Sequence, residues 1–221
     1  MEPIRVYFEN DRLVVCEKPS GFVSEAGGLP DLLCTQKGYD MLYPVHRLDK
    51  MVTGGILYAK TKEAAAALSE QIRNGTFSKV YAAVCEGKIQ NGVGTWEDLL
   101  YYDRKQGKSF VVKKERSGVK KALLQYEVHE TASGEADKPY SLCFVKLITG
   151  RTHQVRVQFS SRGYPLYGDR RYGSTVRDDG FGLRSYRLSF SDPGSGERIE
   201  LEFPFPNITP WNKFDSTKDP T

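Results

Sequence analysis

The sequence lacks the features of membrane, secreted and metal-binding proteins. Its apolar runs extend over a few residues only, too few for a helix that spans a bilayer. Residues 1–5 contain no apolar signal-peptide core, so we expect a cytoplasmic protein. Only 4 cysteines and 3 histidines are present, without a Cys-x-x-Cys pair or closely spaced histidines. Neither a disulfide framework nor a metal site is therefore predicted.

The common phosphate-binding and nucleophile motifs are also missing. The sequence contains no GxxxxGK[ST] loop, no GxGxxG turn after a strand and no GxSxG elbow. Nucleotide-dependent chemistry and serine hydrolysis thus lack their usual residues. Catalysis, if there is any, must rest on another kind of group.

What is present indicates an ordinary globular domain. The chain has 221 residues, of which 39% are hydrophobic and 27% charged, enough to bury a sizeable core. No repeat or Pro/Gly/Ser-rich linker divides it, so we expect a single domain.

Positive charge is concentrated in two stretches. Residues 104–121 contain eight Lys or Arg and one acidic residue, and residues 151–187 contain eight Arg and three Asp, while the rest of the chain is net acidic. Such asymmetry favours a surface that binds a polyanion, and arginine suits phosphates because it contacts them in bidentate fashion. The alternative is that these charges lie on solvated loops and helix faces.

The hydrophobic pattern predicts an α+β fold with a largely antiparallel or mixed sheet and few helices. A helix is expected from the cap Thr61 to Arg73, with Asn74-Gly75 as its stop, and a short one from the cap Thr152 to Gly163. The tail at 207–221 is expected to pack loosely. Strands are expected at 4–8, 13–17, 80–84, 122–128, 140–148, 186–190 and 198–203.

One carboxylate of the sequence lies close to basic residues and a Gly-rich turn. Asp49 ends His-Arg-Leu-Asp at 46–49 and is followed by Lys50 and a Gly-rich turn. Positive neighbours keep a carboxylate ionised, so Asp49 is a candidate nucleophile or base. The alternative is a surface ion pair, which is the commoner role of an Asp beside an Arg.

A second polar stretch, Thr-Gly-Arg-Thr-His-Gln-Val-Arg-Val at 149–157, runs from a turn into the start of a helix. Such a place suits contacts to phosphates or base edges. The alternative is a helix start whose polar groups are satisfied within the protein.

Together these stretches resemble the RluA-type pseudouridine synthases, which isomerise uridine in structured RNA. The resemblance extends over about residues 4–206 and includes short matches at 163–173. Its main segments, in chain order, are Lys-Pro-Ser-Gly at 18–21, His-Arg-Leu-Asp at 46–49, Lys-Val-Tyr-Ala-Ala-Val at 79–84 and the stretch at 149–157.

The sequence departs from the family pattern in two places. The family usually has Thr-Ser-Gly where this chain has Val52-Thr53-Gly54, and a His where it has Gln158. Both changes concern loop packing. The basic RNA-binding domain that often precedes the family's catalytic domain has no counterpart in this sequence, so we expect the two basic stretches to take its place.

The resemblance implies a pseudouridine synthase fold with a central RNA-binding cleft and names four site residues. Asp49 is the essential carboxylate, and Arg156 is expected to pair with it and keep it charged. Tyr81 is expected to stack on the uracil, and Arg47 to enter the space left by the flipped nucleotide. No metal or organic cofactor is implied. We expect removal of Arg156 to change thermal stability little.

The implied partner is structured RNA, ribosomal RNA rather than transfer RNA, with no membrane partner, and we expect a monomer. Residues 1–206 would form the catalytic domain and 207–221 a tail. Two alternatives are a catalytically inactive RNA-binding protein of the same fold and an unrelated carboxylate hydrolase. The presence of Asp49, Tyr81 and Arg156 disfavours the first. A glycosidase needs a second carboxylate, and none stands in a matching motif.

Overall fold

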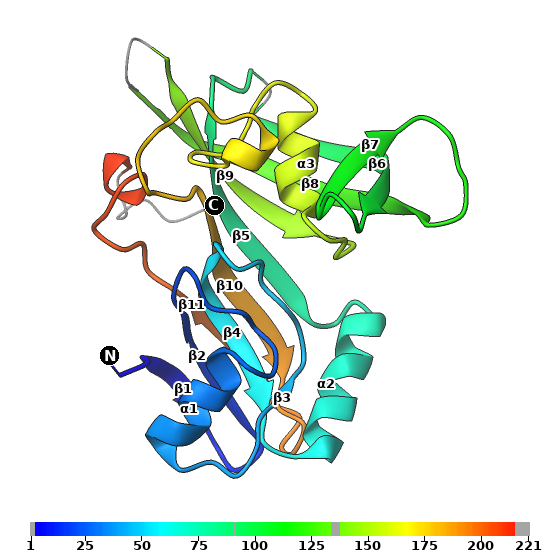
Figure 1. Ribbon diagram of the computed structural model, residues 1–221. Helices are drawn as coiled ribbons and strands as arrows, with labels where there is room; N and C mark the ends of the chain where they lie inside the picture. The colour runs from blue at the N-terminus through cyan, green and yellow to red at the C-terminus, as the bar shows by residue number, and fades with distance from the viewer. Residues whose placement is uncertain (1–2, 91, 134–137, 215–221) are drawn as a thin grey trace. The chain divides into compact units, whose positions relative to one another are not determined.

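The computed structural model describes residues 3–90, 92–133 and 138–214 (Figure 1). The chain folds into two compact units. The first unit comprises residues 1–80 and 184–203, and the second comprises residues 81–183 and 204–221.

In the first unit four strands follow the order β1-β2-β4-β10, while β3 pairs with β4 and β11 with β10. Only the β4–β10 pair is parallel among these pairs, so the sheet is mixed. The predicted hairpins at 4–17 and 186–203 are confirmed. The strands are β1 (Val6–Glu9), β2 (Leu13–Lys18), β3 (Tyr43–Pro44), β4 (Thr53–Ala59), β10 (Leu183–Ser191) and β11 (Arg198–Glu202).

Two helices belong to this unit. Helix α2 (Lys62–Arg73) begins as predicted, since the Thr61 hydroxyl accepts a hydrogen bond of 3.1 Å from the Ala64 amide. Helix α1 (Leu29–Lys37) was not predicted. It has a proline in its first turn and ends at Gly38, whose φ of 74° is the left-handed conformation common at helix ends.

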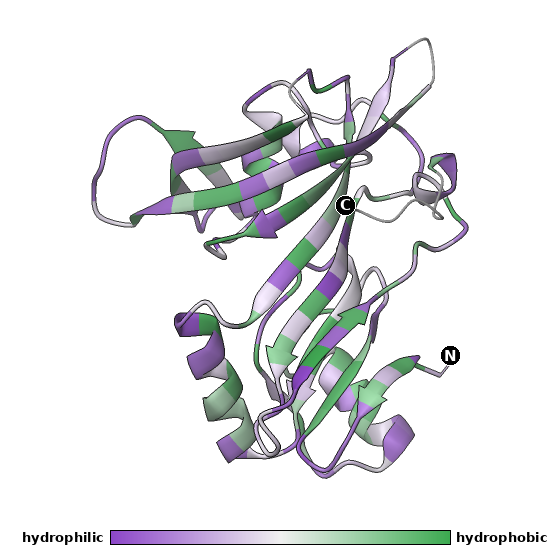
Figure 2. Ribbon diagram, turned by 180° about the vertical axis from the view of Figure 1, so that it is seen from behind, coloured by the Kyte–Doolittle hydropathy of each residue, from purple (hydrophilic) through white to green (hydrophobic). Residues whose placement is uncertain are grey.

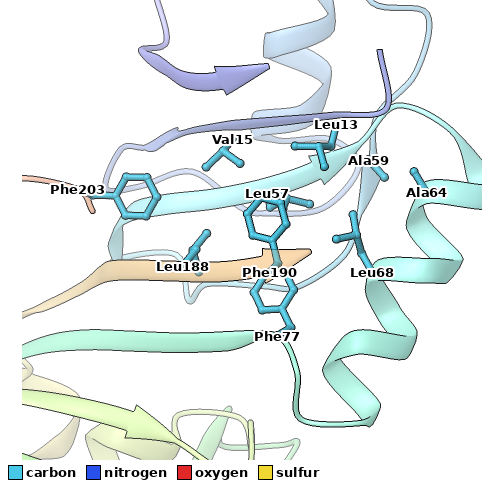
Figure 3. Packing of buried hydrophobic residues seen from close by; sticks show 10 residues of the cluster. All are labelled: Leu13, Val15, Leu57, Ala59, Ala64, Leu68, Phe77, Leu188, Phe190 and Phe203. Atoms are coloured by element: carbon cyan, nitrogen blue, oxygen red, sulfur yellow. The ribbon is translucent and has the colours of Figure 1, made fainter. Parts of the chain in front are cut away.

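The core of the first unit lies between its sheet and α2 (Figure 3). Ala64 and Leu68 of α2 pack against strand residues, and the rings of Phe77 and Phe190 stack with centroids 5.6 Å apart. Each fully buried large apolar side chain contributes about 1.5–3 kcal/mol to folding. This burial stabilises β3 and β4, the two strands that the loop of Asp49 connects.

In the second unit the strand order is β5-β9-β8-β6-β7, and α3 (Gln154–Ser160) lies against the sheet. Leu100, Ala122, Val157 and Tyr172 form the apolar contact between them. The hairpin of β6 and β7 was not predicted, and β8 is longer than expected. The strands are β5 (Ser78–Glu86), β6 (Val93–Asp103), β7 (Lys108–Val112), β8 (Val119–Ala132) and β9 (Tyr140–Leu147).

The α+β class with a mixed, largely antiparallel sheet and few helices is confirmed. Two local predictions are wrong. The residue that caps α3 is His153 rather than Thr152, with a φ of 55°. In the tail Trp211 and Phe214 are buried and Ile208 is exposed, so the tail is anchored at two side chains rather than loose throughout, while 215–221 lie outside the described residues. Among the described residues, no helix is long and apolar enough to cross a membrane.

Candidate active site

Asp49 lies in the loop between β3 and β4 of the first unit and is half-buried. Its carbonyl accepts a 3.0 Å hydrogen bond from the Val52 amide, which closes a tight turn just before β4. Arg47, two residues earlier, is in the same loop. The contacts that hold this turn come from the last residue of β2 and from the segment that follows it.

Ser24 fixes the residue that precedes Asp49. Its hydroxyl donates to the Leu48 carbonyl at 2.9 Å and accepts from the Leu48 amide at 3.1 Å. Both residues are buried, so neither bond competes with water. The Tyr58 hydroxyl in turn donates to the Ser24 carbonyl at 3.2 Å. A single serine thus holds the main chain on the N-terminal side of the carboxylate.

Lys18 fixes the main chain on the other side of Asp49. Its side chain is fully buried, and its ammonium donates to the carbonyls of Pro19, Lys50 and Val52 at 3.0, 3.0 and 2.7 Å. The Gly21 amide also donates to the Lys50 carbonyl, at 2.9 Å. The Lys-Pro-Ser-Gly segment therefore clamps the turn of Asp49, a role that its sequence alone did not disclose.

The Lys18 ammonium also has a lowered pKa. Burial lowers its pKa from 10.5 to about 8, an effect that the negative charges of Asp49 and Glu17 partly oppose. Below pH 8 the site thus contains a buried cation that attracts the Asp49 carboxylate. An ammonium has three N–H donors for its three carbonyls, whereas a neutral amine has only two.

We expect the turnover number to fall as pH rises through about 8, because Lys18 then loses its charge and one donor. Folding stability should not fall with it. The unfolded lysine keeps its proton up to about pH 10.5, so this group makes the fold more stable as pH rises from 8 to 10.5. Rate profiles from pH 6 to 9.5 would be compared with melting curves. A Lys18→Met variant should be slow and lack the step near pH 8. The same step in that variant would contradict the assignment.

His46 is a structural residue. It is buried, and its Nε2 accepts a 3.1 Å hydrogen bond from the Leu57 amide of β4. Burial, aided by the nearby Lys79 charge, lowers its pKa to about 3, so the ring is neutral near pH 7. His46 therefore ties the loop to the sheet and is not available as a proton carrier.

Arg47 is exposed and forms an ion pair with Glu25 at 3.0 Å. Their side chains are 67% and 57% exposed, so the pair contributes little stability. An arginine held this loosely can exchange its partner for a phosphate or a base at small cost.

Arg156 and Tyr81 belong to the second unit. Arg156 lies on α3 and is buried, and its Nε and Nη2 donate to the two carboxylate oxygens of Asp169 at 2.7 and 2.8 Å. The Asp169 side chain is only 1% exposed. Sequence reasoning did not single out Asp169, although Gly168-Asp169 follows the family pattern.

Aromatic rings surround the same guanidinium. Its carbon lies 4.9 Å from the Tyr172 ring centroid and 5.5 Å from that of Phe181. The Tyr172 hydroxyl accepts from the Ser109 amide at 2.7 Å and lies 2.9 Å from His153 Nδ1. These contacts hold the side chain of Arg156 in one orientation. Because the Asp169 pair is buried, our expectation that loss of Arg156 would change stability little must be revised.

The polar residues at 149–154 mainly shape the turn before α3. Gln154 is buried, and its Oε1 accepts from the Thr149 hydroxyl and the Arg151 amide, both at 2.9 Å. Its Nε2 donates to the Leu123 carbonyl at 3.1 Å. Here the alternative of internally satisfied polar groups is correct for Thr149 and Gln154.

Tyr81 is buried at 7% exposure in β5.

The positions that depart from the family pattern are accommodated. Gly54, which matches the glycine of the family pattern, has a φ of 104°, and a Cβ there would clash with the Ser185 carbonyl, so this position requires glycine. Gln158 is buried and donates to Asp98 at 2.6 Å.

Comparison with known proteins shows the family to which the chain belongs. The family model for RNA pseudouridylate synthase matches residues 12–161. The chain is 34% identical over 216 residues to an uncharacterized RNA pseudouridine synthase, YlyB, of Bacillus subtilis, with 91% of this chain and 69% of that protein covered. It is 30% identical over 218 residues to ribosomal large subunit pseudouridine synthase C of Salmonella typhimurium, with 91% and 66% covered. The chain spans about two thirds of the length of these relatives.

A solved structure, human RNA pseudouridylate synthase domain containing 1, superposes with a TM-score of 0.76 at 24% identity and covers 94% of this chain and 88% of that one. At this identity the likeness shows the fold alone. The family match and the curated relatives show more: the chain belongs to the RNA pseudouridylate synthase family, in its RluA-type branch. Enzymes of this class are isomerases that act on uridine in RNA.

Proposed function

We propose that the chain converts specific uridines of structured RNA to pseudouridine and that Asp49 is its essential carboxylate. The observation that carries the proposal is the clamp on the Asp49 turn. Buried Ser24 and buried Lys18 fix the main chain on either side of this residue. A surface ion pair needs no such support, whereas a reacting group must be held in one geometry.

The reaction is a net isomerisation. The bond between uracil N1 and ribose C1′ breaks, the base turns, and a new bond joins C5 to C1′. N1 gains a proton and C5 loses one, so no redox partner or leaving group is required. Asp49 would act either by addition to the base or the sugar or by removal of a sugar proton, and these alternatives stay open.

The other three residues have supporting roles in the proposal. Arg156 would pair with Asp49 and keep it charged, as the family resemblance implies. Tyr81 stacks on the uracil. Arg47 leaves Glu25 and fills the space of the flipped nucleotide, which its exposed ion pair permits.

We further propose that ribosomal RNA is the substrate, ahead of transfer RNA, and that a cytoplasmic monomer with residues 1–206 as catalytic domain performs the reaction. Two relatives named as ribosomal large subunit pseudouridine synthases, C of Salmonella typhimurium and D of Borreliella burgdorferi, support this choice of RNA. Mapping pseudouridine across total RNA from cells with and without this gene tests it. One or a few positions missing from ribosomal RNA would agree, and an unchanged map would contradict the proposed function.

The basic stretch at 104–121 should contribute sequence-independent affinity. Lys113 and Lys114 are exposed in the loop between β7 and β8. Reversing both charges with glutamate should weaken binding of every RNA to a similar extent. The slope of log K against log salt should become shallower by about 0.7–0.9 for each lost phosphate contact. Filter-binding titrations at several salt concentrations would measure the slope, and an unchanged slope would show that both lysines face only solvent.

A further inference from the structure

The face of β6, β7 and β8 that lies opposite α3 is not covered by a helix of the second unit among the described residues. Figure 2 shows these strands in front of α3. Side chains alternate along a strand, and Leu100 of β6 packs toward α3 with Val157. Leu99 and Tyr101 of β6 therefore point to the other face.

This face carries a patch of half-buried apolar residues, which we call the aromatic patch. In the strand register Tyr101 lies between Phe110 of β7 and Val119 of β8, so the three side chains share the face. Leu99 lies opposite Val112 in the same way. The aromatic patch consists of Leu99, Tyr101, Phe110, Val112 and Val119.

Cations lie over its two rings. The Arg116 guanidinium carbon is 4.7 Å from the Tyr101 ring centroid. Lys108 Nζ is 5.7 Å from the Phe110 ring centroid and 5.0 Å from that of Tyr172. The surrounding stretch 104–121 has eight Lys or Arg and one acidic residue. Flat rings bordered by cations are complementary to bases joined by phosphates, and a second copy of this equally basic surface would be repelled.

We infer that the aromatic patch binds single-stranded RNA, with bases stacked on Tyr101 and Phe110 and phosphates contacted by Arg116 and Lys108. The inference rests on the proposed function, in that RNA is the substrate. It adds a surface on which nucleotides other than the reacting uridine can stack. The proposed function required only positively charged residues for contacts to these nucleotides. Stacking is sequence-tolerant, so such a surface would strengthen binding without selecting the site.

The test uses the full chain and a fluorescein-labelled octamer of adenosine, which contains no uridine and cannot be isomerised. Tyr101→Leu and Phe110→Leu keep apolar bulk but remove the flat ring. Each should weaken binding of the octamer by about fivefold to hundredfold, as loss of one base–aromatic contact does. Their salt slope should be unchanged, whereas Arg116→Gln should make it shallower by about 0.7. Fluorescence anisotropy gives both quantities.

Tyr102→Leu is the matched control, because Tyr102 is the next residue of β6 and points to the α3 face. It should leave affinity for the octamer within about twofold. Circular dichroism melting shows whether each variant folds. Should the leucine variants unfold, ultraviolet cross-linking of the wild-type protein replaces them, with adducts expected on Tyr101 or Phe110.

Leucine variants that fold and bind the octamer like wild type would overturn the inference. So would cross-links only outside the patch, or a wild-type dimer that Tyr101→Leu converts to a monomer. None of these outcomes bears on catalysis, which Asp49→Asn tests on a uridine-containing RNA, so the two proposals fail separately.

Discussion

Replacement of Asp49 by asparagine is expected to abolish isomerisation, with a rate loss of at least about a thousandfold. Asparagine has the same shape but neither adds to the substrate nor accepts a proton as a carboxylate does. The fold should tolerate the change, because the turn is held through the main chain of Leu48, Lys50 and Val52. Release of tritium from C5 of labelled uridine measures the rate, and RNA affinity should stay near that of wild type.

Asp11→Asn provides the matched control for this prediction. It removes the same charge from an exposed residue in the turn between β1 and β2. Its tritium release should match that of wild type. Appreciable turnover by Asp49→Asn would show that another group carries out the reaction.

Replacement of Arg156 by methionine is expected to damage both activity and stability. It leaves the Asp169 carboxylate buried without the cation that chelates it, which costs about 3–5 kcal/mol of the free energy of unfolding. For a chain of this size, the melting temperature should drop by about 6–20 °C. Turnover should fall by at least about a hundredfold, the scale of a small misplacement in an active site.

Two further variants separate the effects of Arg156. Arg156→Met combined with Asp169→Asn removes the buried lone charge, so it should regain much of the lost stability but none of the activity. Arg156→Lys should regain only part of the activity, because lysine keeps the charge but not the planar fork. Near-normal turnover of a folded Arg156→Met protein would mean that Arg156 is not part of the catalytic machinery.

Local signals account for the parts of the fold that were predicted. The cap Thr61 and the stop at Asn74-Gly75 are explicit marks of a helix, and the structure contains them. The closing hairpin likewise has alternating apolar residues around a turn rich in Pro and Gly. These elements depend on neighbours in sequence, which is what a sequence pattern reports.

The missed features depend on partners distant in sequence. The chelation of Arg156 joins residues 13 apart, and the bond from Lys18 to Val52 joins residues 34 apart. The segment Lys-Pro-Ser-Gly contains no local pattern that predicts burial of its lysine beneath the turn of Asp49. His153, with a φ of 55°, likewise contacts a partner distant in sequence, the hydroxyl of Tyr172. The β6–β7 hairpin has a basic tip, and a run of charges contains no alternating apolar signal from which strands could be predicted.

Reconstitution with isolated RNA would show whether the carboxylate of Asp49 isomerises uridine. Protein-free ribosomal RNA from cells that lack the gene would be incubated with purified wild-type protein or with Asp49→Asn. Pseudouridine would then be located by carbodiimide labelling and reverse transcription. We expect wild type to restore the positions missing from those cells and Asp49→Asn to restore none. Restoration by Asp49→Asn, or by neither protein when both bind the RNA, would contradict this expectation.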